Sequence, residues 1–213
     1  MRVMDCSPDS IEKARIILEM GGLVVYPTET AYALGADAFN ERALLRLLQA
    51  KQRPPGLPIL VIISHIDMIE PYALIDERTR FLAEKFMPGP LTLAVPKTAL
   101  VPSLLNPEGI SFRITSCEEA RLLVDAVTTP ITGTSANLHG TGLIYDSQSI
   151  ISTFDRSVDI FLDAGTLEPS PPSTVLDMKS SPPTVIREGA IPSQTIFEAL
   201  ASDSFHANME EKA

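Results

Sequence analysis

The apolar positions of this 213-residue chain follow two spacings, which together predict an α/β protein. Residues that recur every three or four positions predict helices in the segments 7–20, 40–51, 75–86, 118–127, 149–155 and 194–201. Short apolar runs predict strands in the segments 23–26, 59–63, 91–95, 109–115, 130–134, 158–163 and 175–178. Because no long linker interrupts these elements, we expect one domain over residues 1–201. The polar segment 202–213 is predicted to be a disordered tail.

Charge and cysteine content narrow the class of protein. A formal net charge of −10 argues against a broad, non-specific grip on nucleic acid, although a local basic cleft stays possible. Cys6 and Cys117 lack the spacing of zinc ligands, so we expect reduced thiols of an intracellular protein. No apolar run approaches the roughly 20 residues that span a bilayer, and no secretory signal is visible. We therefore expect a cytoplasmic protein.

The first candidate site is a predicted strand, turn and helix over residues 22–58. Thr28 and Thr30 follow the strand, where ligands tend to bind in open α/β sheets. Lys51 and Arg53 stand at the C-terminal end of the helix. Each pair also has an ordinary explanation, since threonine is common in turns and the helix macrodipole favours cations at this end. This stretch alone leaves both explanations open.

Two later stretches carry further candidate chemistry. Arg113 lies in an alternating strand, GISFRIT, where its charge must meet solvent, a carboxylate or an anionic ligand. Ser135 and Asn137 are two residues apart in GTSANL, so a β-like backbone would point both side chains the same way. Ordinary turn roles for serine and asparagine stay open.

Several familiar motifs are absent from the sequence. His65, His139 and His206 share no zinc-site spacing, and Ser135 does not lie in a GxSxG turn. There is also no GxxxxGK[ST] loop and no GxGxxG after a strand. A nucleotide would therefore have to be held by side-chain cations and hydroxyls.

The succession YPTET, KQRP, PGPLT, SFRI, TSANLHG, STVLD and IREG resembles the YrdC-like family, the threonylcarbamoyl-AMP synthases, in a short single-domain form. The resemblance covers roughly residues 10 to 192. It implies a single-domain, twisted, open mixed β-sheet flanked by helices, with a ligand cleft on one face. It also implies that L-threonine, bicarbonate and ATP give threonylcarbamoyl-AMP and pyrophosphate. A separate tRNA threonylcarbamoyl transferase complex would then use the product to modify tRNA adenosine 37.

The resemblance also implies roles for eight residues. Those matching the family's threonine site are Thr30, Arg113 and Ser173, and those matching its ATP site are Lys51, Arg53, Ser135, Asn137 and Arg187. Lys51 and Arg53 would act in catalysis. The guanidinium of Arg113 would meet the substrate carboxylate. Mg²⁺ would be held mainly by the ATP phosphates, without a metal site of the protein's own.

The sequence departs from the family's pattern at four positions. Ala33 stands where a glycine is usual, Leu57 where a lysine or asparagine is usual, and Ile62 where a histidine often follows the strand. Thr115 stands where a proline normally follows the arginine by two residues. Two alternatives to the synthase are an RNA-binding, translation-associated module without adenylate synthesis and a carbamoyl-adenylate enzyme of hydrogenase maturation. The acidic charge weighs against the first. The additional segments that accompany this domain in the second class are not visible in this sequence.

Overall fold

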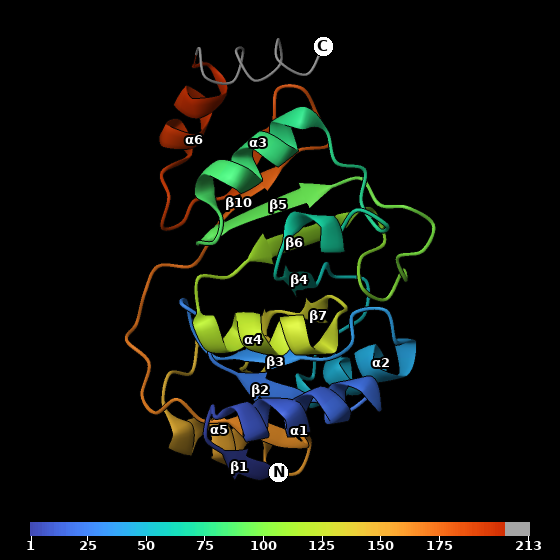
Figure 1. Ribbon diagram of the computed structural model, residues 1–213, viewed down its shortest axis with the longest axis vertical. Coiled ribbons are helices and arrows are strands. Elements are labelled where there is room, and N and C mark those ends of the chain that lie inside the picture. Colours follow the sequence, from blue (N-terminus) through green and yellow to red (C-terminus); the bar gives the residue numbers. More distant parts are fainter. Residues whose placement is uncertain (203–213) are drawn as a thin grey trace.

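The computed structural model describes residues 1–202, and the strands in this range form two mixed sheets, one above the other in Figure 1. The lower sheet has the order β1 (Arg2–Met4), β9 (Ile160–Leu162), β2 (Val24–Tyr26), β3 (Ala33–Gly35) and β8 (Thr134–Ser135). The upper sheet has the order β11 (Thr184–Arg187), β10 (Thr174–Asp177), β5 (Leu91–Val95), β6 (Ile110–Ile114), β4 (Leu60–Ile63) and β7 (Ile131–Thr132). The mixed α/β class is confirmed, with two sheets instead of one.

Helices cover both sheets, and polar caps set where several of them begin. Those within residues 1–202 are α1 (Pro8–Glu19), α2 (Glu41–Ala50), α3 (Glu77–Phe86), α4 (Glu118–Val127), α5 (Ser147–Phe154), α6 (Ser193–Leu200) and the 3-10 turn η1 (Ile66–Met68). As predicted, Asn40 caps α2 by accepting hydrogen bonds from two backbone N–H groups of the first turn. Asp76 caps α3 in the same way, so this helix begins at Glu77, two residues later than predicted.

The segment PITGT, predicted to be one strand, divides between the two sheets. β7 pairs with β4 in the upper sheet, and β8 pairs with β3 in the lower sheet. Gly133 stands at the break, where an added Cβ atom would lie 2.5 Å from Cγ1 of Ile62. A side chain at this position would require the end of the Ile62 side chain to move, so glycine allows close packing at the crossing.

One hydrophobic core joins the two sheets. The lower sheet contributes Val25, Leu34 and Phe161 to this core, and the upper sheet contributes Val61, Leu93 and Phe112. Side chains alternate between the faces of a strand, so β5 and β6 turn Leu93 and Phe112 into the core and Thr92 and Arg113 to the other face. That second face is where polar residues gather.

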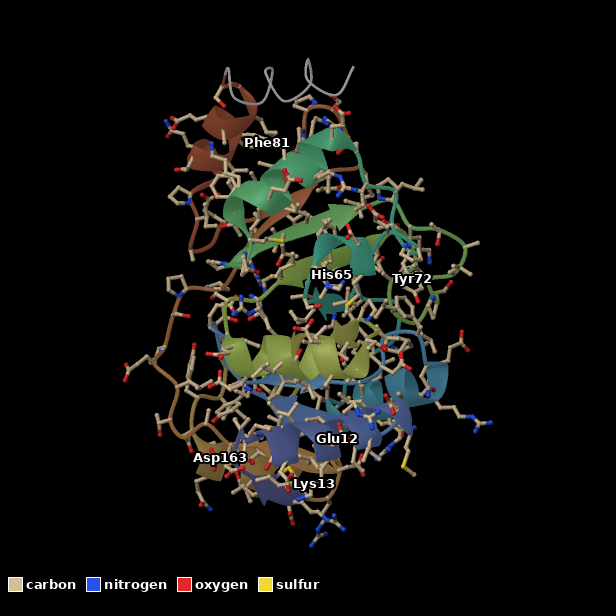
Figure 2. All side chains as sticks on the ribbon, in the orientation of Figure 1. Glu12, Lys13, His65, Tyr72, Phe81 and Asp163 are labelled. Carbon is tan, nitrogen blue, oxygen red and sulfur yellow. The ribbon has the colours of Figure 1, made fainter. Side chains whose placement is uncertain are left out.

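A long connection, residues 163–173, runs from β9 in the lower sheet to β10 in the upper sheet, and we call it the strap. It passes along the left side of the molecule in Figure 1, and Figure 2 labels Asp163 where it begins. The carboxylate of Asp163 accepts hydrogen bonds from the hydroxyl of Ser147 (2.6 Å) and the backbone N–H of Gly165 (2.8 Å). These bonds fix the lower end of the strap against α5.

Two predictions concern the chain ends and membranes. Residues 203–213 of the predicted tail at 202–213 lie outside the described residues. The tail and the domain boundary at 201 therefore stay predictions. Within residues 1–202, no helix combines the length and the apolar character that crossing a bilayer requires. Cys6 and Cys117 both carry free thiols and are half-buried.

Candidate functional site

A cavity of about 430 Å³ opens on the polar face of the upper sheet. The upper sheet lines it with Leu60, Thr92, Ala94, Ser111, Arg113, Val175 and Arg187, and the lower sheet with Ala33, Thr134 and Ser135. The turn after β2, the end of the strap and loop residues from other segments also line it, among them Arg53, Pro58, Asn106, Glu108, Leu143 and Lys179. A cavity of this size, with convergent polar groups on an apolar frame, is typical of a small-molecule site.

Arg113 lies at the centre of the cavity wall, on β6, and is only 3% exposed. Its Nη1 atom lies 3.4 Å from Oε1 of Glu29. This contact is the ion pair that the guanidinium of Arg113 forms within residues 1–202. Its Nε atom is buried without a hydrogen-bond partner in the same range. A guanidinium has five N–H donors, so one carboxylate contact leaves Arg113 able to bind an anion in the cavity.

Hydroxyl groups and a second guanidinium lie beside Arg113. The hydroxyl of Ser173 is 2.9 Å from that of Thr92 and accepts a hydrogen bond from Nη2 of Arg187 (3.0 Å). Arg187 also donates to the backbone oxygen of Ser173. Burial, and after it the charge of Arg113, lowers the pKa of Arg187 below its ordinary value. A pair of neighbouring cations at the same wall favours an anionic ligand.

Thr30 projects into the cavity from the turn after β2. Its hydroxyl is 3.1 Å from that of Thr28, which donates to the backbone oxygen of Ala31 (2.6 Å). The two threonines are therefore part of an ordered turn and also line the cavity. The ordinary turn role therefore holds for these threonines, and their role in ligand binding stays a prediction.

Arg53 contributes a further cation to the cavity. It donates from Nη2 to the backbone oxygen of Pro58 (2.7 Å), and its buried Nε atom has no partner within the described residues. Burial lowers the pKa of this guanidinium from its ordinary value. The contact with Pro58 curls the segment after α2, so that Arg53 points into the cavity.

Lys51 and Asn137 lie behind the cavity wall instead of lining it. The buried ammonium of Lys51 donates to the backbone oxygens of Ser135 and Asn137, the latter at 2.8 Å. The Asn137 carboxamide accepts from the Ser135 hydroxyl (2.5 Å) and donates to the backbone oxygen of Thr141 (2.7 Å). Together they hold the turn that places Ser135 at the cavity.

The structure thus brings six of the eight predicted site residues to the cavity. These are Thr30, Arg53, Arg113, Ser135, Ser173 and Arg187, while Lys51 and Asn137 support the wall from behind. Sequence reasoning missed Thr92 and Ser111, which line the cavity from β5 and β6. The alternation of polar and apolar residues in LTLAV and ISFRI is the signal that places them on the face of Arg113.

The four departures from the family's pattern fall in different surroundings, and one of them, Thr115, is buried just after β6. Ala33 lines the cavity, whereas Leu57 is 39% exposed beside it and Ile62 is buried against Gly133. No group of three or more His, Cys, Asp or Glu side chains within residues 1–202 could hold a metal ion. The charged and polar groups that line the cavity are mainly cations and hydroxyls, together with the carboxylate of Glu108 and the carboxamide of Asn106.

The fold and the cavity together define a mixed α/β protein with a site for a polar, anionic small molecule. A sequence model of the Sua5, YciO and YrdC proteins, described as "Telomere recombination", matches residues 16–189. The chain therefore belongs to the Sua5/YciO/YrdC family.

Known relatives share both sequence and fold with this chain. The threonylcarbamoyl-AMP synthase of Pyrococcus abyssi is 33% identical over 87% of the chain, which spans 56% of that protein's length. A protein of Methanocaldococcus jannaschii, named as a putative threonylcarbamoyl-AMP synthase, is 29% identical over 83% of the chain and 84% of its own length. The crystal structure of P. abyssi Sua5 complexed with L-threonine superposes with a TM-score of 0.89 at 30% identity, covering 94% of this chain and 61% of that one.

Proposed function

We propose that this chain is a threonylcarbamoyl-AMP synthase, an enzyme of the nucleotidyltransferase class. The observation that carries the proposal is the convergence of Arg53, Arg113 and Arg187 with several hydroxyl groups in one cavity. The names of the P. abyssi and M. jannaschii relatives, and the threonine complex of the former, support the same activity.

The proposed reaction joins three substrates. The amine of L-threonine and bicarbonate form a carbamate with loss of water, and a carbamate oxygen then attacks the α-phosphorus of ATP. Pyrophosphate leaves, and threonylcarbamoyl-AMP is the product. No protein nucleophile is needed, because the site acts by holding the reactants together and stabilising the negative charge that develops on phosphate.

The amino acid would bind at the centre of the upper sheet. Arg113 faces the cavity with donors to spare, and a guanidinium matches the two oxygens of a carboxylate. Thr30 and Ser173 supply hydroxyls from opposite walls, one from the turn after β2 and one from the end of the strap. We assign the α-carboxylate of threonine to Arg113 and its remaining polar groups to these hydroxyls.

The ATP phosphates would bind nearer Arg53 and Arg187, with Ser135 as a hydroxyl donor. Lys51 and Asn137 would act from behind, since their side chains fix the turn that carries Ser135. Mg²⁺ bridging the phosphates would neutralise part of their charge. We propose that this ion is held mainly by ATP.

The product would pass to a separate tRNA threonylcarbamoyl transferase complex that modifies adenosine 37, in the cytoplasm. A mixed anhydride of a carbamate and AMP is an activated acyl donor, so its consumer must be an acyl-transfer enzyme with an amine acceptor.

The test is release of pyrophosphate from ATP in the presence of threonine, bicarbonate and Mg²⁺. We expect release to depend on each of these components. Pyrophosphate release that does not require threonine, or no release at all, would contradict the proposal. Binding of tRNA that survives physiological salt in a protein without synthase activity would instead favour the RNA-binding alternative.

Two substitutions should separate the two halves of the site. Arg113→Ala is expected to raise the KM for threonine, and Arg53→Ala the KM for ATP, each by about 10- to 100-fold, the effect of losing a charged hydrogen bond. Arg42→Ala removes an exposed arginine of α2 that does not line the cavity and serves as the matched control. Steady-state kinetics with each substrate varied in turn would show whether Arg113→Ala changes mainly the KM for threonine and Arg53→Ala mainly the KM for ATP.

A further inference from the structure

Glu29 lies directly behind the centre of the candidate site. It belongs to the turn after β2, but unlike its neighbours Thr28 and Thr30 it does not line the cavity. Its carboxylate instead faces Arg113, with 3.4 Å between Oε1 and Nη1. Within residues 1–202 Oε1 has no hydrogen-bond donor, so the nearby charge of Arg113 is its compensation.

Contacts from two separate segments, β6 with the residue after it and the strap, hold Glu29 in this place. The hydroxyl of Thr115, just after β6, donates to Oε2 of the carboxylate. The hydroxyl of Ser170, in the strap, donates to the backbone oxygen of Glu29 (2.8 Å). With Arg113 itself, these contacts fix both the backbone and the side chain of one residue. The carboxylate of Glu29 is therefore held in one position, next to the guanidinium of Arg113.

The neighbours of Arg113 in the upper sheet cannot take over this role. Ile62 pairs with Arg113 in the register of β4 and β6 and has an apolar side chain. On β5, the hydroxyl of Thr92 is hydrogen-bonded to that of Ser173. The other nearby ion, Arg187, is a second cation. Without Glu29, the end of the long Arg113 side chain would have several rotamers of similar energy.

We propose that Glu29 is a positioning residue that holds the guanidinium of Arg113 toward the α-carboxylate of the amino-acid substrate. This inference rests on the proposed function.

Glu29→Gln tests the proposal. Glutamine keeps the size and shape of the side chain, and its amide can still bond to the hydroxyl of Thr115, but it removes the negative charge that faces Arg113. If Glu29 positions Arg113, the substitution should weaken threonine binding about tenfold or more and leave the KM for ATP within about twofold. If Glu29 only neutralised Arg113, its loss would remove a competitor of the substrate carboxylate, and threonine would bind more tightly.

Thr115→Val provides a second test that leaves the charge of Glu29 in place. It removes the hydroxyl that anchors the carboxylate, so we expect a smaller rise in the KM for threonine, of about three- to tenfold. Thr115→Ser keeps the hydroxyl and should resemble the wild type. If Glu29 acted only through its charge, Thr115→Val would not change the KM for threonine. Thr115→Val therefore tests the proposal even if Glu29→Gln does not fold.

The measurements are threonine binding by calorimetry, steady-state kinetics with each substrate varied, and the midpoint of thermal unfolding. Unchanged or tighter threonine binding by Glu29→Gln, in an enzyme whose wild type is active, would overturn this inference alone. Wild-type protein that binds no threonine would overturn the proposed function and this inference together. Weaker threonine binding with an unchanged KM for ATP would support Glu29 as a positioning residue.

Discussion

Lys51 shows how a single buried charge can serve the site without touching its ligand. The side chain is 2% exposed, and its ammonium contacts two backbone oxygens of the turn that carries Ser135. Burial, and after it the charge of Arg53, lowers the pKa of Lys51 to about 8 from 10.5. The protonated amine is therefore less favourable in the folded protein than in the unfolded chain.

This difference predicts a pH dependence of stability. Between pH 8 and 10.5 the unfolded chain holds the proton on Lys51 and the folded protein releases it, so the free energy of unfolding should rise with pH. Relative to Lys51→Met, the wild type should gain up to about 3 kcal/mol across this range. Denaturant unfolding of both proteins at several pH values would measure the gain.

The comparison with Lys51→Met is needed because other groups titrate in the same range. Burial raises the pKa of Cys6 to about 11 and that of Cys117 to about 12, so each thiol alone makes stability fall above pH 9. Both thiols are present in the wild type and in Lys51→Met. Their contributions therefore cancel when the two free energies of unfolding are subtracted. A difference that does not change with pH would mean that Lys51 is not perturbed in the folded state.

Sequence alone could identify the types of residue at the site better than their positions. Arg113 was predictable because a charge in an apolar strand requires a partner. Arg53 became a candidate only through the family resemblance, because a cation near a helix C-terminus needs no ligand to explain it. Whether a lysine two residues earlier lines the cavity or supports its wall depends on the path of the turn at 135–141. That path is set by contacts between distant segments, which local patterns do not encode.

At the scale of elements, the end of the strap and the end of β11 approach each other very closely. A Cβ atom added to Gly189 would lie 2.3 Å from the backbone oxygen of Pro172 and 2.4 Å from the carbonyl carbon of Ser173. The backbone N–H of Ala190 also donates to Pro172 (2.9 Å). This contact keeps Ser173 and Arg187 beside each other.

Gly189→Ala should therefore disturb the site as well as the fold. Backbone atoms cannot move aside as a flexible side chain can, so we expect a loss of about 1–3 kcal/mol in the free energy of unfolding. We also expect a higher KM for threonine, because Ser173 would move away from Arg187. Gly142→Ala is the matched control, since no atom lies within 4 Å of its added Cβ. Equal stability of the two variants would refute the close contact.

The elements themselves were largely predictable, and the exceptions have physical reasons. Helices with capping residues, such as α2, were placed correctly because their signals are local. The short strands β1, β3 and β11 were not predicted, because three or four residues give too little alternation to recognise. The division of PITGT at Gly133 was also missed, since the close contact at this glycine is with Ile62, far away in the sequence.

At the scale of the whole molecule, the cavity lies between two sheets that share one core. Leu34 of β3 and Leu93 of β5 belong to the same buried cluster, although their strands lie in different sheets. A ligand in the cavity contacts both sheets, so its binding energy should stabilise the molecule as a unit. The two sheets are accordingly expected to unfold together in one cooperative transition.

Leu34→Ala tests this cooperativity. Leu34 is 0% exposed, so we expect its truncation to lower the free energy of unfolding by about 2–5 kcal/mol. Hydrogen exchange should show that amides of β6, in the other sheet, lose protection to the same extent as those of β2, because global opening exposes both. Leu100→Ala, at a position 65% exposed, should change stability by no more than about 0.5 kcal/mol. Loss of protection in the lower sheet alone would show that the two sheets unfold independently and that the cavity lies between two separate cooperative units.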